Sequence, residues 1–287
     1  MNRQSRLRVI IFATALAATG SQTLPAQLPS IDKQPWIGYF AAHTSNRYQI
    51  GISSMGELHL KPVVSGAAIA NSYLIEIVPT VLETQSSGKI VAKRIIADSL
   101  ETTDTATDKL EKATYRGRFT GDAAFEITVE QNRGIILVGG RLLDPGKLKN
   151  PLKFALSLEI PNLYPSERKP GADLNEREKR REEKALADKL RGDRLSLKRS
   201  DGSSLRQPLS ESVDAASGEI NGPGISELEL QTETFRGRRL MLNASPGTAM
   251  TLSNSKSAPL YQGFDVAWTP DPTKDPDGKA RLAISFR

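Results

Sequence analysis

Residues 47–61 begin with Arg47-Tyr48-Gln49-Ile50-Gly51-Ile52 and end with Glu57-Leu58-His59-Leu60-Lys61, and polar and apolar residues alternate in both runs. Successive side chains of a β-strand point to opposite faces, so this alternation is typical of strands with one buried face. The two runs are joined by Ser53-Ser54-Met55-Gly56, a short segment that contains glycine. The pattern therefore predicts a β-hairpin.

Strand patterns of the same kind recur along most of the chain, and turn signals such as Asp144-Pro145-Gly146 separate them. In the apolar segment 72–84, we expect Pro79 to break or bulge the strand, because proline cannot donate to a β-ladder. The other predicted strands span 89–96, 113–119, 124–130, 134–138, 152–160, 194–199, 228–235, 238–243, 249–253, 263–269 and 280–286. The fold class is therefore all-β, either one antiparallel β-sandwich or two related β-sandwich halves.

Residues 165–192 differ in composition from the rest of the chain. They carry the charged run Glu176–Lys184 and then Ala185–Leu190, which are good helix formers, and Gly192 follows. We expect one charged, solvent-exposed helix over residues 172–191, as a connector between the β regions 28–164 and 193–287. A spacer is the expected role, and a partner-binding helix is the alternative.

The first 31 residues contain no acidic side chain. Arg3, Arg6 and Arg8 precede the apolar run Val9–Ala18, and small and polar residues follow up to Gln27. This is the order of a secretory signal, and the apolar run is shorter than the roughly 20 residues that a membrane-spanning helix needs. We expect residues 1–27 to be a signal peptide and the mature protein to be secreted or periplasmic, without a transmembrane segment. An uncleaved anchor is the alternative.

Charge and residue types exclude several classes of function. Three of the 39 basic residues lie in the leader, which leaves 36 against 33 acidic residues, too small an excess to indicate nucleic acid as a partner. The chain has no cysteine, which excludes disulfides, thiol catalysis and cysteine-ligated metals. The two histidines, His43 and His59, are sixteen residues apart, and no cluster of carboxylates accompanies them. We therefore predict neither a metal nor a cofactor.

Two five-residue segments match each other: Thr114-Tyr115-Arg116-Gly117-Arg118 and Thr234-Phe235-Arg236-Gly237-Arg238. If both are strands, each presents its two arginines on one face. Guanidinium groups bind carboxylate and phosphate groups, so the candidate ligand-binding residues are Arg116, Arg118, Arg236 and Arg238. Pairing with carboxylates of neighbouring strands is the alternative interpretation.

Two further matches support a duplicated β unit. Residues 91–94 resemble residues 196–199, and residues 154–158 resemble residues 282–286, in the same order along the chain. Insertions in the second copy would explain the growing offset. Chance reuse of short strand patterns in an all-β chain is the alternative.

Catalytic signatures are missing from the sequence. Residues 51–55 lack the closing glycine of a nucleophile elbow. Several acidic residues lie on predicted strands, but nothing in the sequence singles out a pair among Glu126, Glu130, Glu159, Glu227 and Glu229. The best aromatic positions are Trp36 with Tyr39 and Phe40, and Trp268, and such residues more often fill a core than bind a ligand.

These observations favour an exported, non-catalytic protein that binds or scaffolds a macromolecule, such as an envelope polysaccharide or protein. The alternative is a secreted hydrolase that acts on polysaccharide through a carboxylate pair. A hydrolase requires a concave pocket with two carboxylates, one of them with a raised pKa. A binding protein requires a grooved face with exposed aromatic or arginine side chains.

Overall fold

The computed structural model describes residues 27–161, 175–211, 213–254 and 263–287. The predicted signal peptide lies outside these residues except for Gln27, and so does the first part of the predicted connector, through residue 174. Within the described ranges, no helix is both long enough and apolar enough to span a membrane.

The described strands form one hydrogen-bonded network that is antiparallel throughout its strand pairs and curls into two layers. The first layer, here called the first sheet, consists of neighbouring strands in the order β1 (Tyr39–Thr44), β2 (Tyr48–Ser53), β3 (Leu58–Val64), β5 (Ile75–Thr84), β11 (Leu152–Ile160), β17 (Phe264–Pro270) and β16 (Thr248–Asn254). Two short strands, β4 (Ala67–Ala68) and β6 (Ile90–Lys93), pair with β3 and β5. A single turn, η1 (Asn71–Tyr73), precedes β5.

The second sheet consists of β13 (Ser204–Pro208), β12 (Arg194–Arg199), β14 (Ile225–Gln231), β15 (Arg239–Ala244), β18 (Leu282–Phe286), β10 (Ile135–Asp144), β9 (Ala123–Asn132), β8 (Lys112–Phe119) and β7 (Ile95–Glu101), in that order. Ile225 of β14 and Met250 of β16 connect the two sheets. The all-β antiparallel prediction is confirmed.

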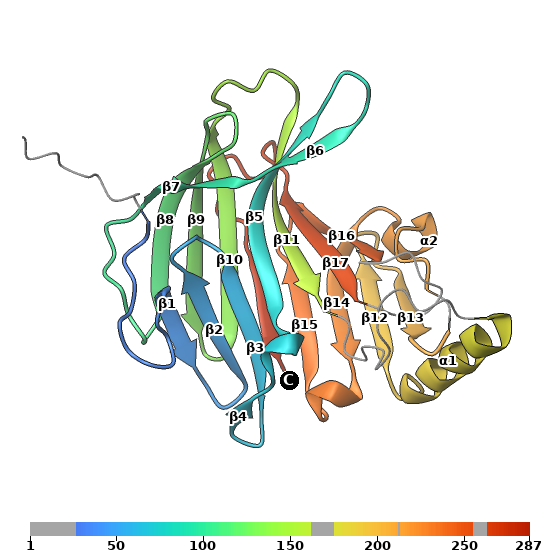
Figure 1. Cartoon of the computed structure of the whole chain (residues 1–287). Coiled ribbons are helices and arrows are strands. Elements are labelled where there is room, and N and C mark those ends of the chain that lie inside the picture. The colour runs from blue at the N-terminus through green and yellow to red at the C-terminus, as the bar shows by residue number, and fades with distance from the viewer. Residues whose placement is uncertain (1–26, 162–174, 212, 255–262) are drawn as a thin grey trace, which may run out of the picture.

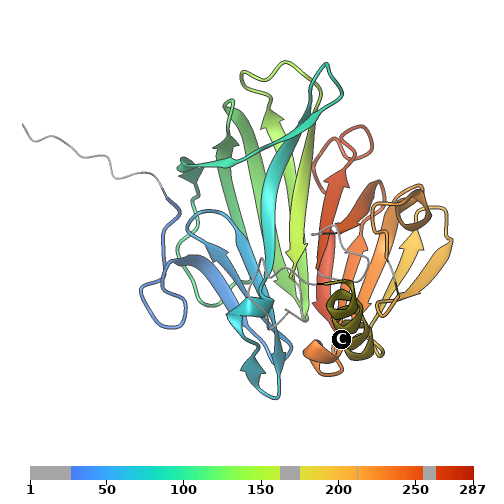
Figure 2. The same ribbon diagram turned by 45° about the vertical axis from the view of Figure 1, so that its right-hand side comes forward.

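Strands from both halves of the sequence share each sheet. In the first sheet, β17 pairs with β11, and in the second sheet, β18 pairs with β10. Figures 1 and 2 show the orange and red C-terminal strands lying beside the green β11. Of the two predicted alternatives, this interleaving corresponds to a single sandwich.

The core lies between the two sheets, because the apolar side of each alternating strand faces inward. One continuous cluster of buried apolar residues includes Ile50, Leu60 and Ile77 from the first sheet and Phe125, Val138 and Ile284 from the second. Trp268 is completely buried in this cluster and Phe40 also belongs to it, so these two aromatic residues fill the core.

The predicted hairpin of residues 47–61 is confirmed as β2 and β3. Its turn is held by the Ser53 hydroxyl oxygen, which accepts hydrogen bonds from the backbone N–H groups of Met55 and Glu57. Gly56 in this turn has a φ of 82°, a left-handed conformation that favours glycine.

Pro79 does not interrupt its strand. On one edge, residues 76–83 of β5 pair with β11 without a register shift. On the other edge, β3 pairs with residues 75–77 of β5 and β6 pairs with residues 81–84, so residues 78–80 have no strand partner there. Pro79 therefore lies where that second edge has no pairing partner, so its missing N–H costs no ladder hydrogen bond.

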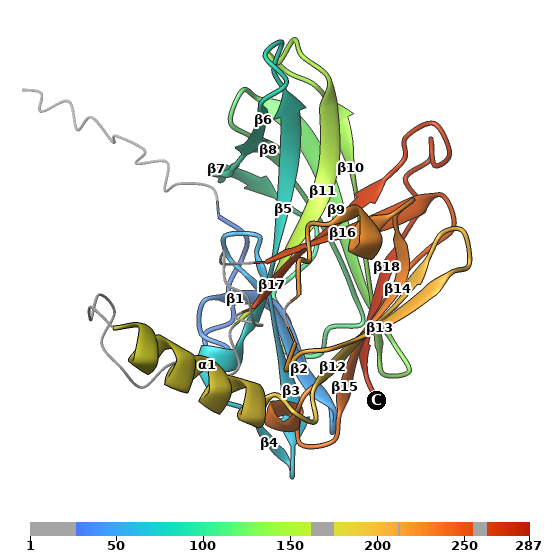
Figure 3. The same ribbon diagram turned by 90° about the vertical axis from the view of Figure 1, so that its right-hand side faces the viewer.

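The predicted charged helix is confirmed as α1 (Glu176–Lys189), which lies outside the two sheets (Figures 1 and 3). It begins at Asn175, whose side chain accepts hydrogen bonds from the N–H groups of Arg177 and Glu178, while the Glu178 side chain accepts one from the Asn175 N–H. No residue within α1 is buried, and Leu190 directly after it belongs to the core. A second, four-residue helix, α2 (Gly218–Asn221), was not predicted.

Residues 234–238 do not form a strand, so the arrangement that would present Arg236 and Arg238 on one strand face is wrong. Residues 233–235 form a single 3₁₀ turn, η2 (Glu233–Phe235), in which the Thr232 side chain accepts a hydrogen bond from the Phe235 N–H. Arg236 and Gly237 follow with φ values of 48° and 84°, so the chain reverses between β14 and β15. The matching segment 114–118 lies in strand β8, so the two segments share sequence without sharing structure.

Candidate functional site

The outer face of the first sheet, which points away from the core, carries a row of side chains that strand pairing places side by side. His59 of β3 lies opposite Glu76 of β5, and Glu76 lies opposite Glu159 of β11. Glu159 in turn lies opposite Asp265 of β17. We call these four residues the acidic row. Directly opposite residues of antiparallel strands have Cβ atoms about 4.5–5.5 Å apart, so three carboxylates are neighbours in this row.

At the His59 end of the row, aromatic and polar side chains form a compact group, here called the His59 cluster: Trp36, Tyr39, Glu57, His59 and Glu76. The Tyr39 hydroxyl and His59 Nδ1 are 2.9 Å apart and share a hydrogen bond. His59 Nε2 lies 3.8 Å from a carboxylate oxygen of Glu57. Burial raises the pKa of Tyr39, which keeps its phenol protonated as a donor. When the Tyr39 hydroxyl donates to Nδ1, the neutral imidazole carries its N–H on Nε2, the nitrogen that faces Glu57.

Two local features bring Tyr39 to the outer face. The pairing of β1 with β2 shifts register between Tyr39 and Ala41, and such a bulge re-aims the side chain at its start. Gly51 lies beneath the Tyr39 ring, and a Cβ atom at Gly51 would overlap Tyr39 Cδ1 and lie 3.1 Å from Trp36 Cζ3. The glycine therefore provides the space in which the two aromatic rings pack, edge to face, with centroids 5.3 Å apart.

The His59 cluster combines two carboxylates with an imidazole. Ligand atoms of Glu57, His59 and Glu76 all lie within 4.8 Å of one another. Imidazole and carboxylate groups of this kind can hold a divalent cation, and two neighbouring carboxylates can also serve acid–base chemistry. All three side chains are partly exposed, so a ligand can reach them.

Next to the acidic row, the outer-face residues of β11, β17 and β16 have small side chains. Ser157 of β11 lies opposite Ala267 of β17, which lies opposite Thr251 of β16. Small residues leave the backbone of the sheet accessible to a ligand that lies across the strands.

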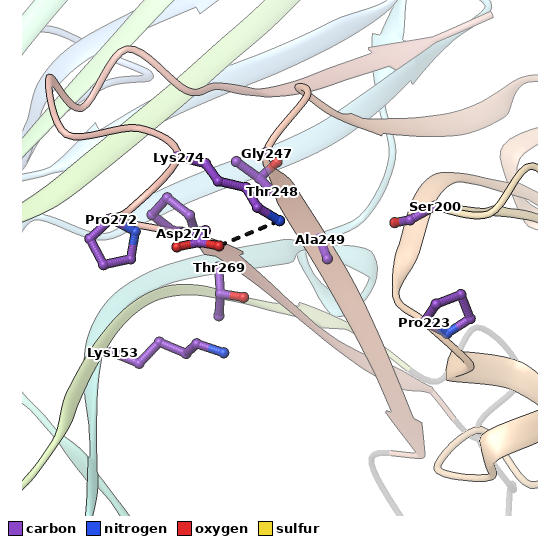
Figure 4. A pocket seen from close by; sticks show the side chains of 11 residues that line it. Lys153, Ser200, Pro223, Gly247, Thr248, Ala249, Thr269, Asp271, Pro272 and Lys274 are labelled. Carbon is purple, nitrogen blue, oxygen red and sulfur yellow. Dashed lines mark ion pairs between the residues drawn. The ribbon is translucent and has the colours of Figure 1, made fainter.

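A cavity of about 510 Å³ lies at the far end of this face (Figure 4). Lys153, Thr269 and Ala249 come from the sheet itself, and Asp271 and Lys274 come from the loop that follows β17. Asp271 is the one carboxylate among its described lining residues, and hydrogen bonds from the side chain and backbone of Thr273 hold the pKa of Asp271 below its usual value. The Lys274 ammonium lies 3.6 Å from that carboxylate. This cavity therefore lacks the carboxylate pair that hydrolysis of a glycosidic bond requires.

The four predicted arginines do not form one surface. Arg116 lies on the outer face of the second sheet and makes an ion pair of 2.7 Å with Glu126. Arg118 lies on the same strand and is exposed. Arg236 is exposed in the turn after η2, and Arg238 donates hydrogen bonds to the carbonyl oxygens of Val63 and Asn46. For Arg116 and Arg238, the contacts correspond to structural roles, and ligand binding by the four residues stays a prediction.

Sequence reasoning placed some parts of the site but not their grouping. The alternation of residues 57–61 predicted the strand that carries His59, and Trp36 with Tyr39 stood out as aromatic positions. Sequence reasoning did not bring Glu57, His59 and Glu76 together, because Glu76 reaches His59 only through the pairing of β3 with β5. The one local signal was Gly51 inside an alternating strand, which often marks a close approach.

No family model and no curated protein sequence matches the chain. Two structures of the α-N-acetylgalactosaminidase NagBb from Bifidobacterium bifidum, with GalNAc and with Gal-NHAc-DNJ, are similar over 86% of this chain, with identities of 11% and 12% and TM-scores of 0.48 and 0.47. The chain spans 35% of the length of those proteins. A galactose mutarotase related enzyme from Lactobacillus acidophilus is similar over 86% of this chain and 96% of its own, with 11% identity and a TM-score of 0.41. At these values, the similarities carry no argument about family or activity.

Proposed function

We propose that this protein is exported and binds carbohydrate, without cleaving it, on the outer face of the first sheet. The observation that carries the proposal is the His59 cluster, in which Trp36 and Tyr39 pack beside an imidazole and two carboxylates. Aromatic rings offer apolar area to the C–H face of a sugar ring, and carboxylate and imidazole groups bind its hydroxyls. The small side chains beyond the acidic row leave room for further sugar residues of the same chain.

Binding without cleavage is favoured by the lining of the cavity at the far end of this face. A glycoside hydrolase needs a pair of carboxyl groups, one of which stays protonated near neutral pH. Among the described lining residues, Asp271 is the one carboxylate, and hydrogen bonds from Thr273 hold its pKa below its usual value.

Retention on polysaccharide tests the proposal. The processed protein is incubated with insoluble cellulose, chitin and starch, and both the bound fraction and the release of soluble reducing ends are measured. We expect retention on at least one polymer, no release of reducing ends, and loss of retention in Trp36→Ala. Arg116→Ala, on the opposite face, is the control and is expected to bind normally. Retention that survives Trp36→Ala but is lost in Arg116→Ala would transfer the binding site to the arginine face.

Hydrolysis is the second candidate, because oxygen atoms of Glu57 and Glu76 lie within 4.8 Å of each other. Retaining glycosidases place their two carboxyl groups about 5–5.5 Å apart. Release of reducing ends by the wild-type protein, abolished by Glu76→Gln, would establish this candidate in place of the binding proposal.

A further inference from the structure

A second cavity, of about 450 Å³, lies at the β1 edge of the first sheet. One side is the turn before β1, the base is the end of β1, and the other side is the segment before β8 together with β9. Its polar and aromatic lining side chains include Gln34, Trp36, His43, Thr44, Glu111 and Gln131.

Backbone hydrogen bonds hold the sides of this cavity in place. Thr107 exchanges hydrogen bonds with the β1 backbone, donating to Phe40 over 3.0 Å and accepting from Ala42 over 2.8 Å. The Leu110 N–H donates to the Ala42 carbonyl over 2.7 Å, which fixes the segment before β8 against β1. On the other side, the Trp36 N–H donates to the Lys33 carbonyl over 2.9 Å. The cavity is therefore formed before any ligand arrives, as small-molecule sites usually are.

The lining suits an uncharged ligand with many hydroxyl groups. The amides of Gln34 and Gln131 and the hydroxyl of Thr44 each offer donors and acceptors. Burial lowers the pKa of His43, so its imidazole is neutral at neutral pH and offers one donor and one acceptor. The charged lining residues are Asp108, Lys109 and Glu111, whose excess negative charge disfavours an anion.

Trp36 belongs to both this cavity and the His59 cluster. Its ring contacts Tyr39 in the cluster and also lines the cavity. A sugar chain that contacts the cluster can therefore continue around Trp36 into the cavity. We propose that the cavity is a further saccharide subsite, which takes an uncharged pyranose residue of the chain bound at the His59 cluster. This inference rests on the proposed carbohydrate-binding function.

Chain-length dependence of binding tests the subsite. The probes are cello-, malto- and N-acetylchito-oligosaccharides of two to six residues, titrated into the processed protein by calorimetry. We expect the affinity of the wild-type protein for at least one series to rise with chain length. Gln34→Leu and Thr44→Val remove polar groups from side chains that line the cavity. Each should lower the affinity for the longest oligosaccharide by about fivefold while leaving the shortest unchanged. Gln207→Leu on β13 of the second sheet is the matched control and should match wild type.

The two proposals fail in different ways. Affinities that Gln34→Leu and Thr44→Val leave unchanged at every length, or lower equally at every length, overturn the subsite. His59→Gln should weaken binding at every length, and an unchanged affinity for all oligosaccharides in that variant overturns the cluster as the binding site. If the wild-type protein binds none of the three series, both proposals are overturned. Thermal unfolding of each variant confirms that it is folded.

Discussion

The outer faces of the two sheets arise from the same alternation of polar and apolar residues, but their charged side chains are arranged differently. On the second sheet, charged residues are paired across strands. Glu126 accepts hydrogen bonds from both Arg116 and Arg141, and Lys198 forms an ion pair of 2.9 Å with Glu227. On the first sheet, the acidic row places the carboxylates of Glu76 and Glu159 directly opposite each other on neighbouring strands.

The second sheet thus carries cross-strand ion pairs that stabilise it, whereas the first sheet carries the face that we propose for ligand binding. Opposite charges directly across a strand pair are favourable, and like charges are unfavourable by a similar amount. On the second sheet, the carboxylates of Glu126, Glu227 and Glu229 are each paired with a basic side chain of a neighbouring strand. In the acidic row of the first sheet, Glu76 lies directly opposite Glu159, a like-charged pair that is unfavourable by itself, and such local costs are typical of functional sites.

The largest expected effect is that of Gly51→Ala in the His59 cluster. A Cβ atom here would overlap the Tyr39 ring, so Tyr39 has to move away from His59. We expect a loss of roughly 1–3 kcal/mol in the free energy of unfolding and a loss of retention on polysaccharide. Urea denaturation and the retention assay measure the two effects. Gly218→Ala is the control, since a Cβ atom there meets nothing within 4 Å. Normal stability and retention in Gly51→Ala would contradict the packing described here.

The next effect is that of Glu126→Gln on the second sheet. Burial by itself would raise the pKa of Glu126, but hydrogen bonds and positive charge from Arg116 and Arg141 outweigh it and hold this pKa below 4.5. We expect the variant to lose about 1 kcal/mol of stability at pH 7.

The sign of the pH dependence follows from that lowered pKa. The contribution of Glu126 is fully present above the pKa of the unfolded state and is lost as pH falls through the lowered pKa of the folded state. Denaturation at pH 7 and at pH 3 should therefore give a smaller difference between wild type and Glu126→Gln at the lower pH. A constant difference would argue against the charge pairing.

On the acidic row, the same kind of substitution should have the opposite sign. Glu159→Gln removes one of the neighbouring like charges, so we expect a gain of a few tenths of a kcal/mol in stability. Measured beside Glu126→Gln by urea denaturation at pH 7, it compares carboxylate-to-amide changes on the two faces. A loss of stability in both variants would remove the distinction between the faces.

The smallest effect is expected for Glu227→Gln. The Lys198 and Glu227 side chains are 50% and 45% exposed, and exposed pairs contribute little. The change in the free energy of unfolding should stay within about 0.5 kcal/mol and shrink further at high salt. A larger change would show that the pairs of the second sheet act as a network.

Period-two patterns made the all-β class, the hairpin of β2 and β3 and most of the other strands predictable. The prediction failed at Pro79 and at residues 234–238, where the outcome depends on more than local pattern. Pro79 is tolerated because of where its neighbouring strands end. The Thr-aromatic-Arg-Gly-Arg pattern folds as a strand at Arg116 and as a turn at Arg236, where the chain adopts left-handed conformations.

The sequence by itself determined that the chain forms antiparallel strands with one apolar side, and that a charged helix separates two groups of strands. Both properties follow from side-chain periodicity and helix propensity, which act over a few neighbouring residues. Only the tertiary structure decided that His59, Glu76, Glu159 and Asp265 stand in one row, because register between strands distant in sequence depends on how the whole core packs. The same packing made Trp36 part of both the His59 cluster and the lining of the cavity at the β1 edge.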